Sequence, residues 1–369
     1  RPITEIGMVK DVAIDGGKVT VGVYLTISAC PMQDTIVNSV KDAVSKVRDV
    51  TEVEVELDVM SPEQRTALRE KLQGPTKEIR FNQPGSLTRI YAIASGKGGV
   101  GKSSVTVNLA AAIAQSGYVV GVLDADIWGF SIPRMLGLSD RLEAKRIDGV
   151  EKPQIIPNER RIGNGLLKVV STGMLVDDEG TALMWRGLML TKAVEQFLND
   201  VHWGELDYLL IDMPPGTGDV QMGLARMLPR TDLVIVTTPA VSAQKVAIRA
   251  ADMARRSFLR VAGVIENMSA FTCEHGTSYA LFGTGGGKAL ADEIGAELLG
   301  QVPIESAVAH AGDTGEPIVI NGSGAAADAF NAIAQKIIAN TISLSEMAGC
   351  SARNEDVVAV SVSRRDNNA

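Results

Sequence analysis

The sequence predicts an α/β fold in which a mostly parallel sheet is flanked by helices and preceded by a small α+β domain. From residue 88 onward, short runs rich in Val, Ile and Leu alternate with helical stretches, as in parallel sheets covered on both faces. Before residue 74 the chain shows a hairpin pattern, one helical stretch and one alternating strand. The 369 residues are therefore divided into a small domain, a linker, a larger domain and a tail expected to be mobile. Their bounds are 1–73, 74–87, 88–340 and 341–369.

Composition excludes several classes of function. Lys+Arg 36 against Asp+Glu 44 gives a net charge of -8, whereas proteins that bind nucleic acid by general electrostatics need a basic surface. Aromatic residues make up 4% of the chain, which is too few for a base-stacking platform. No apolar run approaches the roughly 20 residues that span a bilayer, and three scattered cysteines do not make a disulfide framework. We therefore expect a cytoplasmic protein that binds neither nucleic acid nor membrane.

The small domain is predicted element by element. Two alternating runs, 12–14 and 19–26, flank an Asp-Gly-Gly turn and predict a hairpin. Apolar residues at helical spacing over 36–47 predict a helix. Apolar residues alternate with acidic ones over 53–57, which predicts a half-buried strand. Ser-Pro-Glu at 61–63 is typical of the start of a second helix.

The larger domain contains five short apolar runs that predict buried strands. They cover residues 90–94, 119–123, 208–211, 233–236 and 261–265. Most are followed by a loop that contains Gly or Pro, and a helix ending near Gly117 is predicted after the first.

The loop after the first of these strands fits the phosphate-binding pattern G-x-x-x-x-G-K-[ST] in full. Its residues are Gly96, Lys97, Gly98, Gly99, Val100, Gly101, Lys102 and Ser103. Such glycines allow the backbone to direct N–H groups at a polyphosphate in front of a helix. We expect Lys102 to bridge the β- and γ-phosphates of ATP, Ser103 to bind Mg²⁺ and Ser104 to assist at the α-phosphate.

Lys97 and two acidic segments complete the predicted nucleotide site. A lysine directly after the first glycine cannot share the pocket with Lys102, so we expect Lys97 to reach the phosphates of a dimer partner. A solvated lysine is the alternative. Asp212, after four apolar strand residues, is expected to hold Mg²⁺, and Asp126 to orient the attacking water. The Pro-Pro-Gly-Thr-Gly run at 214–218 is expected to sense the γ-phosphate.

Together these residues resemble the deviant phosphate-loop ATPases, the class that contains MinD, ParA and the nitrogenase iron protein. The segments 184–187, 266–269 and 282–287 narrow the resemblance to the Mrp/ApbC group of iron–sulfur cluster carrier ATPases. Residues 1–73 resemble the metal–sulfur-cluster assembly domain that many members carry. The resemblance implies a homodimer that sandwiches two ATP molecules, with Lys97 crossing between subunits. It also implies that Asn267 reads the adenine edge and that the segment around Pro303 lines that pocket.

At the cluster site the sequence departs from this family. The family has a C-x-x-C, and two thiolates from each subunit complete one cluster. This chain keeps Cys273 but has Gly276 at the second position, so a dimer offers two of the four protein ligands of a [4Fe–4S] cluster. In an extended segment His275 would share a face with Cys273, and two Cys and two His could hold a [2Fe–2S] unit. Cys30 or exogenous thiols are further candidates, Cys30 could be a small core residue, and Cys273 could be an ordinary thiol.

The predicted function is a slow, Mg²⁺-dependent ATPase that carries a labile iron–sulfur cluster to recipient apo-proteins. ATP would set the geometry of the homodimer, and cluster-assembly proteins are expected partners. The alternative is a nucleotide-dependent regulatory switch of the MinD/ParA kind without a metal. The missing second cysteine favours this alternative, whereas the acidic net charge and the lack of a C-terminal amphipathic helix oppose its DNA-binding and membrane-binding versions.

Overall fold

The computed structural model describes residues 3–340 with short gaps. The gaps are 5–6, 26–32, 62, 65–67, 69–78, 84, 127–128, 151, 176–186 and 217. Cys30, most of the helix predicted from Ser61 and the tail at 341–369 therefore lie outside the described residues. The chain divides into two compact units, residues 1–78 and 79–369.

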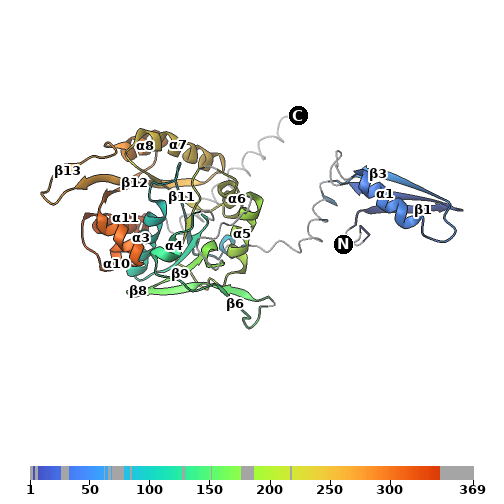
Figure 1. Ribbon diagram of the computed structural model, residues 1–369, viewed down its shortest axis with the longest axis horizontal. Coiled ribbons are helices and arrows are strands. Elements are labelled where there is room, and N and C mark those ends of the chain that lie inside the picture. The colour runs from blue at the N-terminus through green and yellow to red at the C-terminus, as the bar shows by residue number, and fades with distance from the viewer. Residues whose placement is uncertain are drawn as a thin grey trace, which may run out of the picture. The chain divides into compact units, whose positions relative to one another are not determined.

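The small unit is a three-stranded sheet with one helix packed against it (Figure 1). Strand β1 (Val9–Asp15) pairs antiparallel with β2 (Lys18–Leu25), and β2 pairs parallel with β3 (Glu52–Val59). Helix α1 (Gln33–Val44) makes the crossover between the two parallel strands and buries Val40 against the valines of β2. The predicted hairpin, helix and half-buried strand are confirmed.

The large unit is built on a nine-stranded sheet. Its strand order is β13-β12-β11-β4-β10-β5-β9-β8, and β14 pairs with β12. The five predicted strands are β4 (Arg89–Ala94), β5 (Val119–Asp124), β10 (Tyr208–Asp212), β11 (Asp232–Thr237) and β12 (Arg260–Thr272), and they run parallel. The strands that the sequence did not predict are β8 (Asn158–Ile162), β9 (Gly165–Ser171), β13 (Ser278–Tyr279) and β14 (Leu298–Ile304), with β6 (Glu143–Lys145) and β7 (Gln154–Ile156) as a separate pair.

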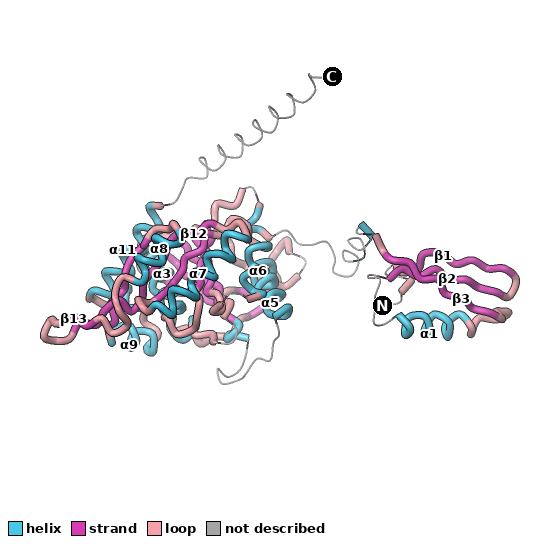
Figure 2. The backbone as a smooth tube through the Cα atoms, turned by 90° about the horizontal axis from the view of Figure 1, so that it is seen from above, coloured by secondary structure: helices cyan, strands magenta, loops and turns pink. Residues whose placement is uncertain are grey.

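Helices cover both faces of this sheet (Figures 1 and 2). Helices α5 (Gly187–Asp200), α6 (Asp219–Met227), α7 (Val241–Arg256) and α8 (Gly286–Ile294) pack on one face. The other face carries α3 (Lys102–Gln115), α4 (Ile132–Met135), α10 (Ile318–Asn321) and α11 (Ala325–Ala339), and α9 (Ser306–Thr314) contacts α4. In β4, alternate residues enter the two cores, Ala92 on one face and Ile93 on the other. Within the described residues, no helix is long and apolar enough to cross a membrane.

Part of the predicted linker belongs to the large unit. Residues 80–82 form a short 3₁₀-helix, η1 (Arg80–Asn82). Another 3₁₀-helix of the large unit, η2 (Thr172–Leu175), follows β9. Ile79 and Phe81 are buried in the core beneath α5 and α6. The Pro and Gly residues of this segment indicated a linker. Because the two apolar side chains are buried, residues 79–83 belong to the large unit instead.

The parallel strands bring the acidic residues of the predicted site to one edge. In the sheet register Asp212, the last residue of β10, lies beside Ile93 of β4 and beside Asp124 of β5. The phosphate loop leaves β4 at the same edge. Side chains that are 109 residues apart in sequence, such as those of Ser103 and Asp212, therefore come into direct contact.

The start of β9 gives a test of this packing. A Cβ added at Gly165 would lie 2.0 Å from the carbonyl oxygen of Ala114 and 2.5 Å from that of Tyr118. We expect Gly165→Ala to lower the free energy of unfolding by about 2 kcal/mol, measured by urea denaturation. Gly85→Ala is the control, because a Cβ there meets no atom within 4 Å. Equal urea midpoints for the two variants would contradict the contact between β9 and the end of α3.

Candidate functional site

The phosphate loop connects β4 to α3, as the sequence predicts. Gly99 and Gly101 both have φ +79, a conformation that favours glycine. A Cβ at Gly96 would lie 2.4 Å from the backbone nitrogen of Ala247. The loop therefore needs glycine at these positions, and the first N–H groups of α3 have no partner within the helix. Unpaired N–H groups at a helix N-terminus are the donors that bind a polyphosphate.

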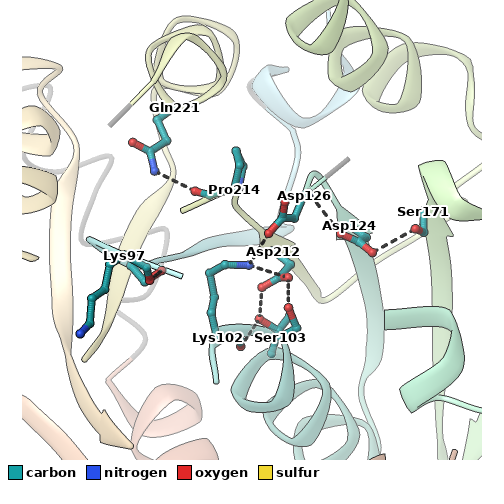
Figure 3. A network of polar contacts seen from close by, with 11 residues as sticks. Lys97, Lys102, Ser103, Asp124, Asp126, Ser171, Asp212, Pro214 and Gln221 are labelled. Atoms are coloured by element: carbon teal, nitrogen blue, oxygen red, sulfur yellow. Dashed lines mark hydrogen bonds and ion pairs between the residues drawn. The ribbon is translucent and has the colours of Figure 1, made fainter. Parts of the chain in front are cut away.

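Lys102 lies at the centre of a buried polar cluster (Figure 3). Its side chain is 6% exposed, and its Nζ lies 2.7 Å from Oδ2 of Asp212 and 3.7 Å from Oδ2 of Asp126. The contact is an ion pair, and the ammonium has no well-directed hydrogen bond within the described residues. A cavity of about 260 Å³ adjoins it, lined by the phosphate loop, Asp126 and Pro215.

Asp212 is fully buried and accepts hydrogen bonds on both oxygens. Ser103 Oγ donates to Oδ2 at 2.7 Å, and Thr106 Oγ1 donates to Oδ1 at 2.7 Å. Hydroxyl and carboxylate oxygens are the ligands that Mg²⁺ prefers, so Ser103 and Asp212 fit a magnesium site. Thr106 was not among the site residues predicted from the sequence. Its position three residues after Ser103, on the same face of α3, was the available signal.

Asp124 was also missed, although it stands in the same Asp-Ala-Asp segment as Asp126. It is fully buried, and its carboxylate accepts from the Ser171 hydroxyl at 3.0 Å and from the Asp126 N–H at 3.1 Å. Burial and the neighbouring charge of Asp212 raise the pKa of Asp124 to about 7. Burial also raises the pKa of Asp126, while Lys102 opposes the rise. The signal was its position at the end of β5, in register with Asp212.

Lys97 points away from this cluster (Figure 3). Its side chain is exposed, and its Nζ donates to Ser242 Oγ at 3.4 Å, near the start of α7. The reach across a dimer interface stays a prediction. The run 214–218, which is predicted to sense the γ-phosphate, contacts α6. Gln221 of α6 donates from Nε2 to the carbonyl of Pro214 at 3.2 Å, so α6 holds the first part of this run. Thr217 lies outside the described residues.

Asn267 lies against the phosphate loop. Its Nδ2 donates to the carbonyl of Val100 at 2.9 Å, and a Cβ on Gly101 would lie 2.2 Å from the same nitrogen. The amide therefore supports the loop, and its contact with adenine stays a prediction. Pro303 is half-buried on β14, next to Val302, which pairs in register with Asn267.

Cys273 lies at the tip of the β12–β13 hairpin. Residues 273–277 form a turn in which Cys273 N–H donates to Thr277 O and Gly276 N–H donates to Cys273 O, both at 2.9 Å. Gly276 has φ +79. These two bonds close a turn, so the segment is not extended and the condition under which His275 would share a face with Cys273 is not met.

The turn changes the chemistry of the thiol. Backbone hydrogen bonds from His275 and Thr277 lower the pKa of Cys273, since N–H donors stabilise a thiolate. His275 is exposed. No group of three or more His, Cys, Asp or Glu in the described part of one chain is placed to hold a metal ion. The turn thus presents a half-exposed thiol with a lowered pKa and, within the described residues, without a complete ligand set of its own.

The raised pKa of Asp124 predicts a pH dependence of stability. In the folded protein its pKa is about 7, against about 4 in an unfolded chain. The folded state binds more protons between these values, so the free energy of unfolding falls as the pH rises from about 4 to about 7. Asp124→Asn removes this contribution. We expect the parent to lose stability relative to the variant across this range, measured by urea denaturation without Mg²⁺ or nucleotide. Parallel pH profiles would contradict the assignment.

Comparisons with known proteins identify the family of the chain. Residues 86–338 match the family described as NUBPL iron-transfer P-loop NTPase, and residues 1–56 match the family described as iron-sulfur cluster assembly protein. The chain is 48% identical over 332 residues to an iron-sulfur cluster carrier protein of Mycobacterium leprae (strain TN), covering 88% of this chain and 84% of the relative. A protein of the same name from Synechocystis sp. is 40% identical over 340 residues, covering 91% of this chain and 92% of the relative.

A solved structure shows the same fold. The nucleotide-binding protein of Archaeoglobus fulgidus in complex with ADP has a TM-score of 0.54 and 36% identity, and the match covers 65% of this chain and 91% of that protein. The fold, the phosphate loop and the family match over residues 86–338 therefore lead to one conclusion. The chain belongs to the NUBPL iron-transfer P-loop NTPases, the MinD/ParA-like family of iron–sulfur cluster carriers, and it bears an iron–sulfur cluster assembly domain at its N-terminus.

Proposed function

We propose that the protein binds ATP·Mg²⁺ at the phosphate loop, hydrolyses it slowly, and carries a labile iron–sulfur cluster that passes to recipient apo-proteins. Nucleotide state would control the geometry of a homodimer and thereby retention of the cluster. The observation that carries this proposal is that one strand, β12, contacts the phosphate loop through Asn267 and ends at the Cys273 turn.

The polar cluster supplies the parts that phosphoryl transfer needs. The ammonium of Lys102 lies close to the carboxylates of Asp126 and Asp212. A phosphate bound in the loop would therefore interact with the same ammonium as these two carboxylates. Ser103 and Asp212 would hold Mg²⁺, which neutralises charge on the phosphates. Asp126 borders the cavity and would orient the attacking water. Buried Asp124 lies behind Asp126 and accepts its N–H, so it positions that residue.

Strand β12 provides a route from nucleotide to thiol. Between Asn267 and the hairpin, Met268 has φ +58 and the pairing with β14 shifts register. A non-glycine residue in this conformation is uncommon, and the irregularity gives the strand a bend at this point. A change in the loop that alters the Asn267–Val100 contact would be passed along the five residues to the turn at Cys273. The strand therefore links the two halves of the proposed function.

Exposed apolar side chains support a homodimer that places two Cys273 turns together. The β12–β13 hairpin extends from the body of the large unit (Figures 1 and 2). Phe271, Tyr279, Leu281 and Phe282 are exposed on and after it, and such patches are typical of protein interfaces. Lys97, directed out of its own pocket, would reach the phosphates bound by the partner.

The cluster is cargo, and two Cys273 thiolates would hold it weakly. The remaining iron positions would be filled by His275, by Cys30 or by exogenous thiols, and a ligand set this incomplete suits transfer to a recipient. The cytoplasm, where thiols stay reduced, is the proposed compartment, and cluster-assembly proteins would load the carrier.

A metal-free regulatory switch of the MinD/ParA kind is the second candidate. Gly276, at the position where the family has its second cysteine, favours it. Both candidates use the phosphate loop in the same way, so only the fate of iron and sulfide at Cys273 separates them.

Replacement of the loop lysine tests the nucleotide site. We expect Lys102→Ala to weaken ATP binding at least about tenfold, because a buried charged partner of the phosphates is lost, and to abolish hydrolysis. Isothermal titration and phosphate release measure the two effects. Lys97→Ala removes the other lysine of the loop and is the matched control. It should bind ATP but form fewer dimers with ATP in sedimentation. Hydrolysis at the parent rate in Lys102→Ala would overturn the site.

Reconstitution with iron and sulfide without oxygen tests the cargo. We expect the parent to develop visible charge-transfer absorption and Cys273→Ala to develop none. Gly276→Cys should release iron to a chelator more slowly than the parent, because it restores the second thiolate and a Cβ there meets no atom within 4 Å.

Gly149→Cys is the matched control for this substitution. It adds a cysteine at another open glycine with positive φ, in the loop between β6 and β7. Its release rate should equal that of the parent. Absence of colour in the parent and in Gly276→Cys would overturn cluster carriage and favour the switch.

A further inference from the structure

A second cavity opens at the opposite end of the large sheet from the phosphate loop. It has a volume of about 290 Å³ and is lined by the beginnings of β4, β11 and β12 and by the segments before them. The phosphate loop, Asp124 and Asp212 lie at the opposite, carboxyl ends of the parallel strands β4, β5 and β10. The nucleotide site therefore does not use this cavity, which is called the basal pocket below.

The basal pocket carries unbalanced positive charge. Arg89, Arg230 and Arg260 line it, against the single carboxylate of Asp232. Arg260 forms an ion pair with Asp232, with Nε 2.7 Å from Oδ1. Tyr91 also lines the pocket, and because burial raises its pKa to about 12, its phenol stays neutral. Arg89 lies over the ring of Tyr208, a contact that does not neutralise its guanidinium group. Arg230 is exposed, with no ion pair found among the described residues. Two guanidinium groups thus remain for an anionic ligand, on a chain whose net charge is -8.

The rim of the basal pocket is apolar. Phe258 is 95% exposed and Leu87 is 70% exposed, and both line the cavity. Phe258 has φ +59 and follows Ser257, the residue that caps the end of α7. Glycine is preferred at this position because it adopts positive φ without strain. An aromatic ring here is unfavourable for the backbone and gains no burial, so folding does not explain its presence.

We propose that the basal pocket binds an extended acidic peptide segment of a partner protein, with a large apolar side chain flanked by carboxylates. Arg230 and Arg89 would receive the carboxylates, and Phe258 with Leu87 would clasp the apolar side chain. Arginine and aromatic residues dominate the binding energy of protein interfaces. The cavity is small for a drug-sized ligand, whereas Phe258 and Leu87 on its rim expose most of their surface to solvent, which favours a peptide. The proposal is independent of the proposed function and would stand if the protein carried no cluster.

A random twelve-residue peptide library, displayed and selected on the full chain, tests this proposal. We expect enriched peptides to contain Asp or Glu on both sides of Phe, Trp or Leu. By fluorescence polarisation, Phe258→Gly and Arg230→Gln should each weaken binding of the best peptide at least about tenfold. Phe258→Gly should melt at or above the parent temperature, which separates lost binding from lost folding. Arg249→Gln, which removes an exposed arginine of α7 that does not line the pocket, should leave binding unchanged.

Several results would overturn the proposal. They are the absence of any enriched peptide, enrichment of peptides without acidic residues, and equal binding by Phe258→Gly and the parent. Sedimentation tests a second copy of the chain as the occupant. A change in oligomeric state in Phe258→Gly, with no peptide bound by the parent, would assign the pocket to self-association and overturn binding of a partner peptide.

Discussion

The buried carboxylate of Asp212 is the constraint on which the nucleotide site depends. A buried charge is costly unless it is paired and hydrogen-bonded. Among the described residues, the compensation comes from α3, which supplies one ammonium, from Lys102, and two hydroxyls, from Ser103 and Thr106. The end of β10 and the start of α3 therefore hold each other in place. The position of the phosphate loop follows from this contact and from the glycine geometry between β4 and α3.

Asp124 and Asp126 belong to one segment at this edge of the sheet, but their surroundings differ. Asp124 is in register with Asp212 and has no solvent contact, whereas Asp126 borders the cavity. Two carboxylates side by side in a dry environment do not both ionise readily. The protonation of Asp124 is therefore coupled to whatever charge occupies the cavity, and a cation there would favour its ionised form.

The place of the phosphate loop between β4 and α3 could be predicted from sequence because its signals are local. Gly96 to Ser103 carry their geometry in the residue types themselves, and the apolar runs before Asp124 and Asp212 marked the strand ends. The contact of Asn267 with Val100 joins residues 167 apart, and no periodicity reports it. The turn at Cys273 is closed by hydrogen bonds between its own backbone groups, and the residue types at 273–277 do not report these bonds. The Pro and Gly residues around 79–83 indicated a linker, whereas the burial of Phe81 depends on partners elsewhere in the chain, which the local sequence does not report.

Helix α3 has a mechanical consequence for the molecule. From Val105 to Ala114 every side chain is buried, so the helix is enclosed by the sheet and by α10 and α11 rather than lying on the surface. A helix that is packed on all sides cannot tilt or shift without disrupting the surrounding core. Motion that accompanies nucleotide turnover would therefore be confined to surface segments, such as 214–216 and the β12–β13 hairpin, while α3 stays in place.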